Sequence, residues 1–126
     1  MTLASCVIFY SFLAGIDPQL TQAVIQVESN GNPFALGRNQ DSGLMQIRHK
    51  LVPETQQQLF QGCTNIKRGV ALLKQAREKC KHKLDNTWLV CYNAGLKGGS
   101  KLKHPSSFIY YKKVMSEMKN SLKSLQ

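Results

Sequence analysis

The chain has 126 residues, with 17 Lys and Arg against 7 Asp and Glu, so its formal net charge at neutral pH is +10. This length is typical of a single domain spanning residues 1–126, and the lack of repeats and low-complexity tracts excludes a repeat array or a disordered linker. The positive charge favours an anionic partner, such as a nucleic acid, an anionic membrane surface or an anionic cell-wall polymer.

The first 15 residues, MTLASCVIFYSFLAG, form an apolar run that is too short to span a bilayer. The run could be an export signal, but no positive charge begins it and Phe12-Leu13-Ala14 is a poor cleavage site. We therefore expect a first core helix here, with an export signal either absent from this sequence or carried in this run.

The next segment has the start, the spacing and the end of an amphipathic helix over residues 18–29. Asp17 suits the N-cap and Pro18 suits the first helical position. The residues Asn-Gly-Asn-Pro at positions 30–33 end the pattern. Apolar residues recur between these limits at helical spacing, at Leu20, Ala23, Val24 and Val27.

The rest of the chain predicts more helices around one irregular segment. Residues 34–47 are rich in Gly, Asn, Asp and Ser, which is typical of a loop or a small irregular β flap. Helices are expected at 53–60, at 64–79 with Thr64 as N-cap, after a cap at Asn86 or Thr87, and at about 106–122. The predicted fold class is mainly α, with one small non-helical flap.

Four cysteines stand at positions 6, 63, 80 and 91. An even number in a small basic chain suggests disulfides and an oxidising compartment, with buried free thiols as the alternative. No metal site is expected, because the chain has no CxxC pair and His82 beside Cys80 is too few ligands for zinc.

Glu28 is the most informative acidic residue. At about 100° per residue it falls between Val24 and Ile25 around the helix axis, inside the apolar arc. Burial would raise the pKa of this carboxyl, and a carboxylic acid that is still protonated near neutral pH can act as a general acid. The alternative is a side chain in the last helical turn that simply reaches solvent.

Uncharged polar and aromatic residues accompany this acid and suit a sugar ligand. Amide side chains follow Glu28 at Asn30, Asn32, Asn39, Gln40 and Gln46, and they can pair with hydroxyl and N-acetyl groups. Trp88 and Tyr92 lie one helical turn apart and could stack on sugar rings, although Trp88 could equally be a core residue. Residues 92–95 (YNAG) place a phenol and an amide at a helix end.

Together these motifs resemble the lysozyme-like lytic transglycosylase domain of the soluble lytic transglycosylase type, glycoside hydrolase family 23. The resemblance covers about residues 6–115. It is carried by Glu28-Ser29, by Asn32-Pro33 with Ala35, by GLMQI at 43–47, by Asn65 and Gly69, by YNAG at 92–95, and by Tyr110 or Tyr111. It implies a lysozyme-like α+β fold in which a helical bundle and a small flap enclose a glycan groove.

The same resemblance implies the chemistry. Glu28 would be the catalytic acid and base that cleaves the β-1,4 bond between N-acetylmuramic acid (MurNAc) and N-acetylglucosamine (GlcNAc), leaving a 1,6-anhydro end. No cofactor or metal is implied, and the partner would be the glycan strand of peptidoglycan, met by a monomer outside the cytoplasm, in the periplasm or cell envelope. The implied substrate-binding residues are Ser29, Met45, Gln46, Tyr92, Asn93 and Tyr110.

Some features resemble a subgroup, the small enzymes attached to secretion, conjugation and pilus systems. They are Cys6, Cys63 and the Asp41-Ser42 pair, and they imply the disulfides Cys6–Cys63 and Cys80–Cys91, with components of such a system as possible partners. The chain also departs from the family. Many members have Ser where this chain has Gly37, and Asn or Pro where it has Arg48.

Three alternative functions are weighed against this one. Asp41 could hold a water molecule across the groove, which would give hydrolysis as in a lysozyme. The Lys-rich second half could belong to a non-catalytic wall-binding scaffold. A nucleic-acid role is not expected, because no binding motif orders the basic residues and residues 96–101 lack P-loop spacing.

Overall fold

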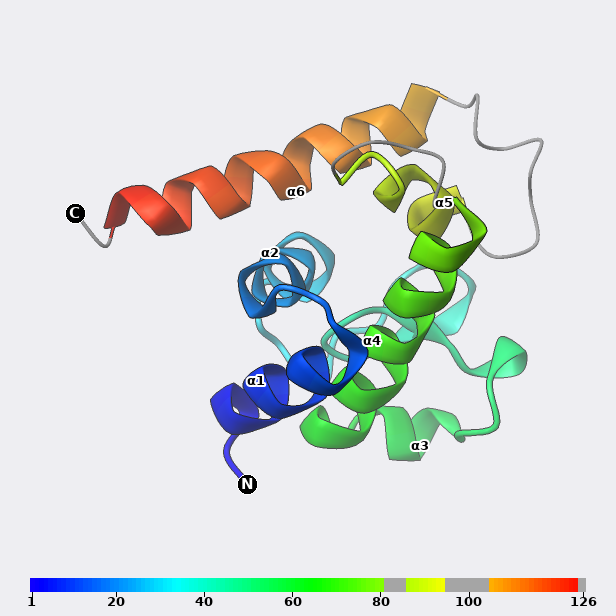
Figure 1. Cartoon of the computed structure of the whole chain (residues 1–126). Coiled ribbons are helices and arrows are strands. Elements are labelled where there is room, and N and C mark those ends of the chain that lie inside the picture. The colour runs from blue at the N-terminus through cyan, green and yellow to red at the C-terminus, as the bar shows by residue number, and fades with distance from the viewer. Residues whose placement is uncertain (81–85, 95–104, 125–126) are drawn as a thin grey trace.

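The computed structural model describes residues 1–80, 86–94 and 105–124, and the statements below concern that part of the chain (Figure 1). Helices dominate, and the only sheet among these residues has two short antiparallel strands, which confirms the mainly α architecture with a small flap. None of the described helices is long and apolar enough to cross a membrane. The Gly-rich loop expected at residues 96–100 lies outside the described residues.

The elements of the described part of the chain, in chain order, are the six helices labelled in Figure 1, two short strands and two single 3-10 turns. They are α1 (Leu3–Ala14), α2 (Pro18–Ser29), η1 (Arg38–Gln40), β1 (Asp41–Ser42), β2 (Ile47–Arg48), η2 (His49–Leu51), α3 (Gln56–Leu59), α4 (Gly62–Lys79), α5 (Leu89–Ala94) and α6 (Pro105–Ser124).

Helix α2 has the predicted bounds and lies between two other helices. The Asp17 side chain accepts a hydrogen bond from the Gln19 backbone N–H, and Pro18 occupies the first turn. Asn30 ends the helix in the left-handed conformation, with φ of 54°. Figure 1 shows α1 on one side of α2 and α6 on the other, and α2 packs against both.

The boundaries of three helices differ from the expectation. Helix α4 begins at Gly62, because the carbonyl of Gln61 accepts the backbone N–H of Asn65 at 2.9 Å and closes the first turn two residues before Thr64. Helix α3 covers only Gln56–Leu59, since Thr55 forms a capping box with Gln58 and so fixes a later start than residue 53. Helix α6 extends slightly beyond both predicted ends.

Two disulfides attach the ends of α4 to neighbouring helices, and both have the pairing implied by the family resemblance. Cys6–Cys63 joins α1 to the start of α4, with a Cα–Cα distance of 5.6 Å. Cys80–Cys91 joins the end of α4 to α5, with a Cα–Cα distance of 6.6 Å. The long helix α4 is thereby fixed at both ends, and its apolar face, with Ile66, Val70 and Leu73, is buried in the core.

The flap consists of residues 34–51 between α2 and α3, four residues longer than the predicted 34–47, and its strands are held in one register. Asp41 pairs with Arg48 and Ser42 pairs with Ile47, while an isolated bridge joins Leu36 to Ser42. Gly43 has a φ of 79°, which an L-residue rarely adopts, and it starts the turn between the two strands. The flap therefore returns on itself over a few residues, close to the end of α2.

Candidate active site

Glu28 is partly buried in the last turn of α2, next to the fully buried side chains of Val24 and Ile25. Burial raises the pKa of Glu28 from 4.5 to about 7. A hydrogen-bonding interaction with the Tyr110 hydroxyl acts in the opposite direction, and the negative charge of Asp41 raises the pKa further. Near neutral pH, this carboxyl is therefore populated in both its protonated and its charged form.

Two tyrosines from separate helices lie beside Glu28. Tyr110 of α6 is 6% exposed, and its ring centroid lies 6.3 Å from that of Tyr92 of α5, with the planes inclined at 31°. Burial and the charge of Glu28 raise the pKa of both phenols. Each therefore stays protonated and able to donate a hydrogen bond. Of the two late tyrosines considered, Tyr110 rather than Tyr111 interacts with Glu28.

The Tyr110 hydroxyl has unused hydrogen-bonding capacity. It is buried and, among the described residues, has no partner in standard hydrogen-bond geometry. It nevertheless interacts with the Glu28 carboxyl closely enough to lower the pKa of that group. We interpret the contact as a long or poorly aligned hydrogen bond, which is common in catalytic groups before substrate binds.

Gln46 is fixed inside the flap rather than extended from it. Its φ is 51°, and its amide nitrogen donates to the carbonyl oxygens of Ala35 and Gly43, both at 3.1 Å. A Cβ atom at Gly37 would overlap the amide oxygen of Gln46. The space that a serine would need at position 37 is thus filled by Gln46, so this departure from the family is compatible with the packing of the flap.

Met45 is completely buried, so its backbone rather than its side chain can border a ligand. Its sulfur packs against Gly69, where any Cβ would overlap it. Its carbonyl oxygen lies 3.5 Å from the Tyr92 hydroxyl, which donates to it. The Met45 sulfur packs closely against Gly69 of α4, and this contact fixes the turn between β1 and β2 beside Tyr92.

Asn65 anchors the flap to α4, a role that the sequence analysis did not assign. It is fully buried, and its amide oxygen accepts the Met45 N–H at 2.8 Å. Its amide nitrogen donates to the carbonyls of Ser42 at 2.8 Å and Leu59 at 2.9 Å. The sequence contained a signal for this role, because Asn65 stands beside Ile66 on the apolar side of a predicted helix, where a polar side chain needs hydrogen-bond partners.

Asp41 has its own partner in the flap. The Arg48 guanidinium donates to its carboxylate at 3.1 Å, across the register pair of the two strands. The carboxylate is 25% exposed. Arg48, where the chain departs from the family, is therefore the partner of Asp41, whose role the sequence left open. The two opposite charges form an ion pair.

The remaining candidate residues mostly stabilise the protein. The Ser29 hydroxyl donates to the Ile25 carbonyl at 3.1 Å and accepts the Gly31 N–H, and Asn32 accepts the Phe34 N–H. Trp88 is only 4% exposed, in agreement with the core alternative. Asn93 lies in α5, but its side chain is outside the described residues.

The arrangement brings one carboxyl of raised pKa against two protonated phenols, beside a flap held by the amides of Asn65 and Gln46. A carboxyl in this state can give a proton to a leaving group and later take one back. Residues 5–108, more than four fifths of the chain, match the family model described as Transglycosylase SLT domain.

Proposed function

The chain belongs to the transglycosylase SLT domain family, and from this premise we propose that it cleaves the β-1,4 bond between MurNAc and GlcNAc in peptidoglycan and leaves a 1,6-anhydro-MurNAc end. The single observation that carries this proposal is Glu28, a partly buried carboxyl whose pKa burial raises to about 7. The family supports lytic transglycosylase activity on peptidoglycan in general, and the bond and the product are the part that we propose.

In the first step, protonated Glu28 gives its proton to the glycosidic oxygen. The bond between that oxygen and C1 of MurNAc breaks, GlcNAc leaves with a C4 hydroxyl, and positive charge develops on the MurNAc ring. The acetamido group of the same sugar can share that charge. The Tyr110 hydroxyl, which has no standard partner among the described residues, is placed to hydrogen-bond the carboxylate that forms.

In the second step, charged Glu28 takes the proton of the C6 hydroxyl of the same MurNAc. The C6 oxygen then bonds to C1 and closes the 1,6-anhydro ring, and Glu28 is protonated again for the next cycle. One carboxyl serves both steps, so its pKa must lie near the working pH. A pKa of about 7 meets that condition, whereas an exposed glutamate near 4.5 would be a poor acid at neutral pH.

Hydrolysis is the alternative, and the geometry of Asp41 argues against it. Most glycosidases use two carboxylates, the second as a base or nucleophile. Asp41 is bound to Arg48 at 3.1 Å, so we assign it to the stability of the flap and to the electrostatic control of Glu28. A lysozyme-type reaction would release reducing ends instead of anhydro ends, and product analysis separates the two.

We propose two kinds of role for the other site residues. Tyr92, Tyr110 and Asn93 would border the glycan. Ser29, Met45 and Gln46 would act through the backbone that they hold in place, since each is bonded or packed within the protein.

We also propose that the protein works outside the cytoplasm, in the periplasm or cell envelope, and opens the wall locally for a secretion, conjugation or pilus apparatus. Two disulfides support an oxidising compartment. The resemblance of Cys6 and Cys63 to the cysteines of that subgroup supports the more specific role.

The test is mass spectrometry of muropeptides released from purified peptidoglycan. The wild type should release anhydro-muropeptides, and Glu28→Gln should release none while still sedimenting with the insoluble wall. Glu78→Gln, which changes an exposed glutamate of α4, is the matched control and should keep wild-type activity. Release of products by Glu28→Gln would refute the assignment of the acid. Binding of the wall by the wild type without release of products would instead favour the scaffold alternative.

A further inference from the structure

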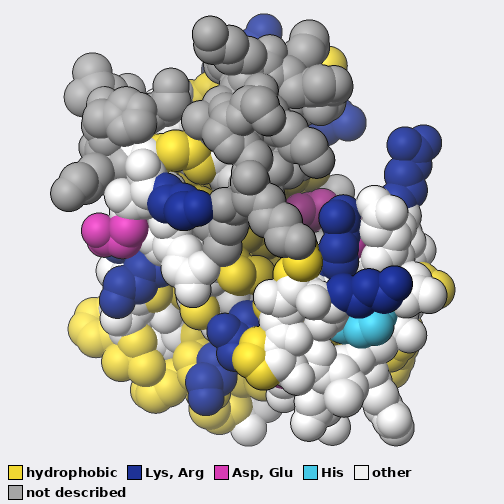
Figure 2. Space-filling view, turned by 90° about the vertical axis from the view of Figure 1, so that its right-hand side faces the viewer, with side chains coloured by type: hydrophobic (Ala, Val, Ile, Leu, Met, Phe, Trp, Pro, Cys, Tyr) yellow, Lys and Arg dark blue, Asp and Glu magenta, His cyan; other side chains and the backbone are white. Residues whose placement is uncertain are grey.

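Helix α1 carries a face of large apolar side chains that nothing in the described part of the chain covers. The exposed fractions are 60% for Ile8, 47% for Phe9, 80% for Phe12 and 63% for Leu13, and α1 contains no acidic or basic residue. Figure 2 shows hydrophobic side chains gathered in the lower part of the molecule, at the height of α1 in Figure 1, with Lys and Arg side chains beside them. Apolar patches on soluble proteins commonly mark an interaction surface.

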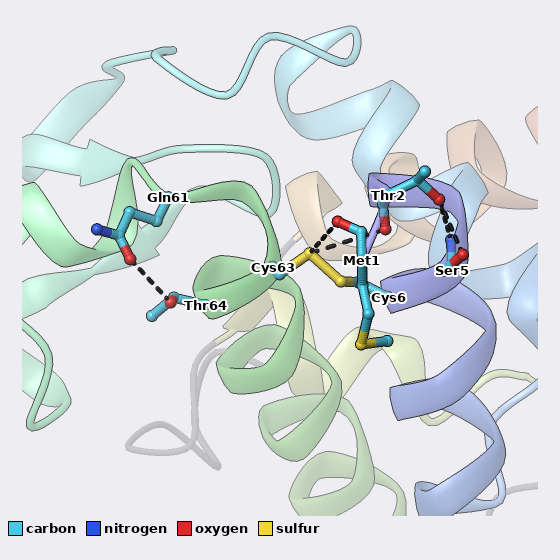
Figure 3. The surroundings of a disulfide bond; sticks show 7 residues. All are labelled: Met1, Thr2, Ser5, Cys6, Gln61, Cys63 and Thr64. Atoms are coloured by element: carbon cyan, nitrogen blue, oxygen red, sulfur yellow. Dashed lines mark hydrogen bonds between the residues drawn. A yellow bond between two sulfur atoms is a disulfide. The ribbon is translucent and has the colours of Figure 1, made fainter.

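This face cannot turn inward. The opposite side of α1 is buried through Cys6, Val7 and Ser11, and Cys6 is bonded to Cys63 of α4 (Figure 3). The hydroxyls of Ser11 and Thr21 form a buried hydrogen bond of 2.7 Å between α1 and α2. A rotation that buried the phenylalanines would break the disulfide and leave two buried hydroxyls without partners.

The exposed face is also hollowed. Met1, Ser5, Ile8, Phe9 and Phe12 line a shallow, open depression along the helix. The atoms that line this depression are mostly apolar, so it is part of the same exposed apolar face.

Cations border one edge of this face. The Lys67 ammonium lies 6.0 Å from the centroid of the Tyr10 ring, which contacts the Phe9 ring edge-on at 5.1 Å. Arg77 donates to the carbonyl oxygens of Gly15 and Ala14, at the end of α1.

A third cation completes this edge. Lys74 is exposed on α4, two helical turns after Lys67 and one before Arg77. Glu78 adds one negative charge on the same helix, so the row formed by Lys67, Lys74 and Arg77 has a net positive charge.

We propose that the apolar face of α1, with the Lys67–Lys74–Arg77 row, docks the protein on the surface of a bilayer that contains anionic phospholipids. Ile8, Phe9, Phe12 and Leu13 enter the boundary between headgroups and acyl chains, and the lysines pair with lipid phosphates. The 12 residues of α1 are about 18 Å long, less than the roughly 30 Å of hydrocarbon, so the helix lies in the plane of the interface.

A second copy of the chain is a poorer occupant. A two-fold dimer through α1 would bring the same patch of both copies together, and with it both cation rows. Like charges would then face each other at the rim, whereas anionic lipid attracts the same charges.

Docking through α1 also leaves the site accessible, because α6, the helix that contains Tyr110, lies on the other side of α2 (Figure 1). The inference does not depend on the reaction that we propose for Glu28.

The test is co-sedimentation of the full chain with vesicles of phosphatidylcholine, alone or mixed in equal parts with phosphatidylglycerol. We expect the wild type to bind the mixed vesicles and to bind pure phosphatidylcholine at least about tenfold more weakly. The double variant Phe12→Ser, Leu13→Ser should lose about a hundredfold or more in binding, since each buried side chain is worth about one factor of ten or more. Ile109→Ser changes a residue of α6 that is 54% exposed and is the matched apolar control.

The charge row has its own variant and control. Lys67→Gln with Lys74→Gln should weaken binding to the mixed vesicles several-fold, and Lys112→Gln with Lys119→Gln on α6 should not. Circular dichroism and urea unfolding with the midpoint of the wild type establish that the α1 variants are folded. The proposal is overturned if the wild type ignores the mixed vesicles, if the α1 variants bind like the wild type, or if sedimentation velocity shows a dimer that Phe12→Ser dissociates.

Discussion

Asn65 makes a sharp test of how the flap is held over the site. Replacement by alanine removes three buried hydrogen bonds, to the Met45 N–H and to the carbonyls of Ser42 and Leu59. Each such bond contributes about 1 kcal/mol net, so the variant should lose about 3 kcal/mol of unfolding free energy, and more if the three backbone groups stay unsatisfied. The loss is large for a domain of this size, whose total stability is on the order of 5–15 kcal/mol.

Urea unfolding followed by tryptophan fluorescence measures this loss. Asn120→Ala is the control, because Asn120 is exposed on α6 and the change should stay within about 0.5 kcal/mol. Asn65→Asp distinguishes hydrogen bonding from packing. It preserves size and the acceptor for Met45, but it points a carboxylate oxygen at two carbonyl oxygens. It should therefore be at least as unstable as Asn65→Ala at neutral pH. A loss below about 1 kcal/mol in Asn65→Ala, or a stable Asn65→Asp protein, would refute the anchoring argument.

Three further predictions concern the acid and the flap. Because the pKa of Glu28 is raised from 4.5 to about 7, its ionisation opposes folding, and the stability that it contributes is present below pH 4.5 and is lost as the pH rises through 7. Glu28→Gln should therefore gain up to about 3 kcal/mol over the wild type at pH 8 and almost nothing at pH 4, as measured by urea unfolding. Tyr110→Phe should raise the pKa of Glu28, because the hydroxyl lowers that pKa. The alkaline limb of the pH–rate profile should therefore move to higher pH. Gly37→Ala should displace the Gln46 amide, reduce the rate of muropeptide release severalfold and destabilise the protein by about 1–2 kcal/mol.

Each of these has an outcome that contradicts it. A Glu28→Gln protein with the same stability difference at pH 4 and pH 8 would mean that the carboxyl is not desolvated. An alkaline limb that stays in place or moves to lower pH in Tyr110→Phe would remove the phenol from the control of Glu28. Wild-type activity in Gly37→Ala would show that the Gln46 amide can shift at no cost.

The elements defined by local signals could be predicted from the sequence. Helix α2 follows from a cap at Asp17, a proline after it, apolar spacing and an Asn-Gly stop, all within 15 residues of chain, and both of its bounds agree with the prediction. The flap was recognisable from its Asn, Gly and Ser content. The start of α4 was placed too late, because Thr64 is a better cap by residue type, whereas the bond from Asn65 N–H to the Gln61 carbonyl decides the boundary.

The hydrogen-bond partners of the amide side chains in and before the flap could not be predicted from the sequence. The residue types suggested amides free to meet a sugar, but the nitrogen of Gln46 is bonded to two carbonyls and Asn32 caps a turn. Asn39 and Gln40 have φ angles of 56° and 61°, a conformation that asparagine tolerates better than most residues. The amides of Gln46 and Asn32 therefore satisfy the backbone of irregular segments, and the periodic patterns that reveal helices contain no information about such pairs.

The protonation state of the Glu28 carboxyl depends on the same long-range contacts. Helix α2 alone would leave Glu28 at the end of an isolated helix, exposed to water and with an ordinary pKa. Packing of α2 against α6 removes that water, the Tyr110 hydroxyl limits the rise in the pKa of Glu28, and Asp41 of the flap adds to it. Because Arg48 forms an ion pair with Asp41, the residue that departs from the family at position 48 holds in place a charge that acts on the pKa of an acid twenty positions earlier. Control of Glu28 thus rests on three separate segments of the chain, so a substitution in the flap can change the pH at which the protein works without touching the carboxyl itself.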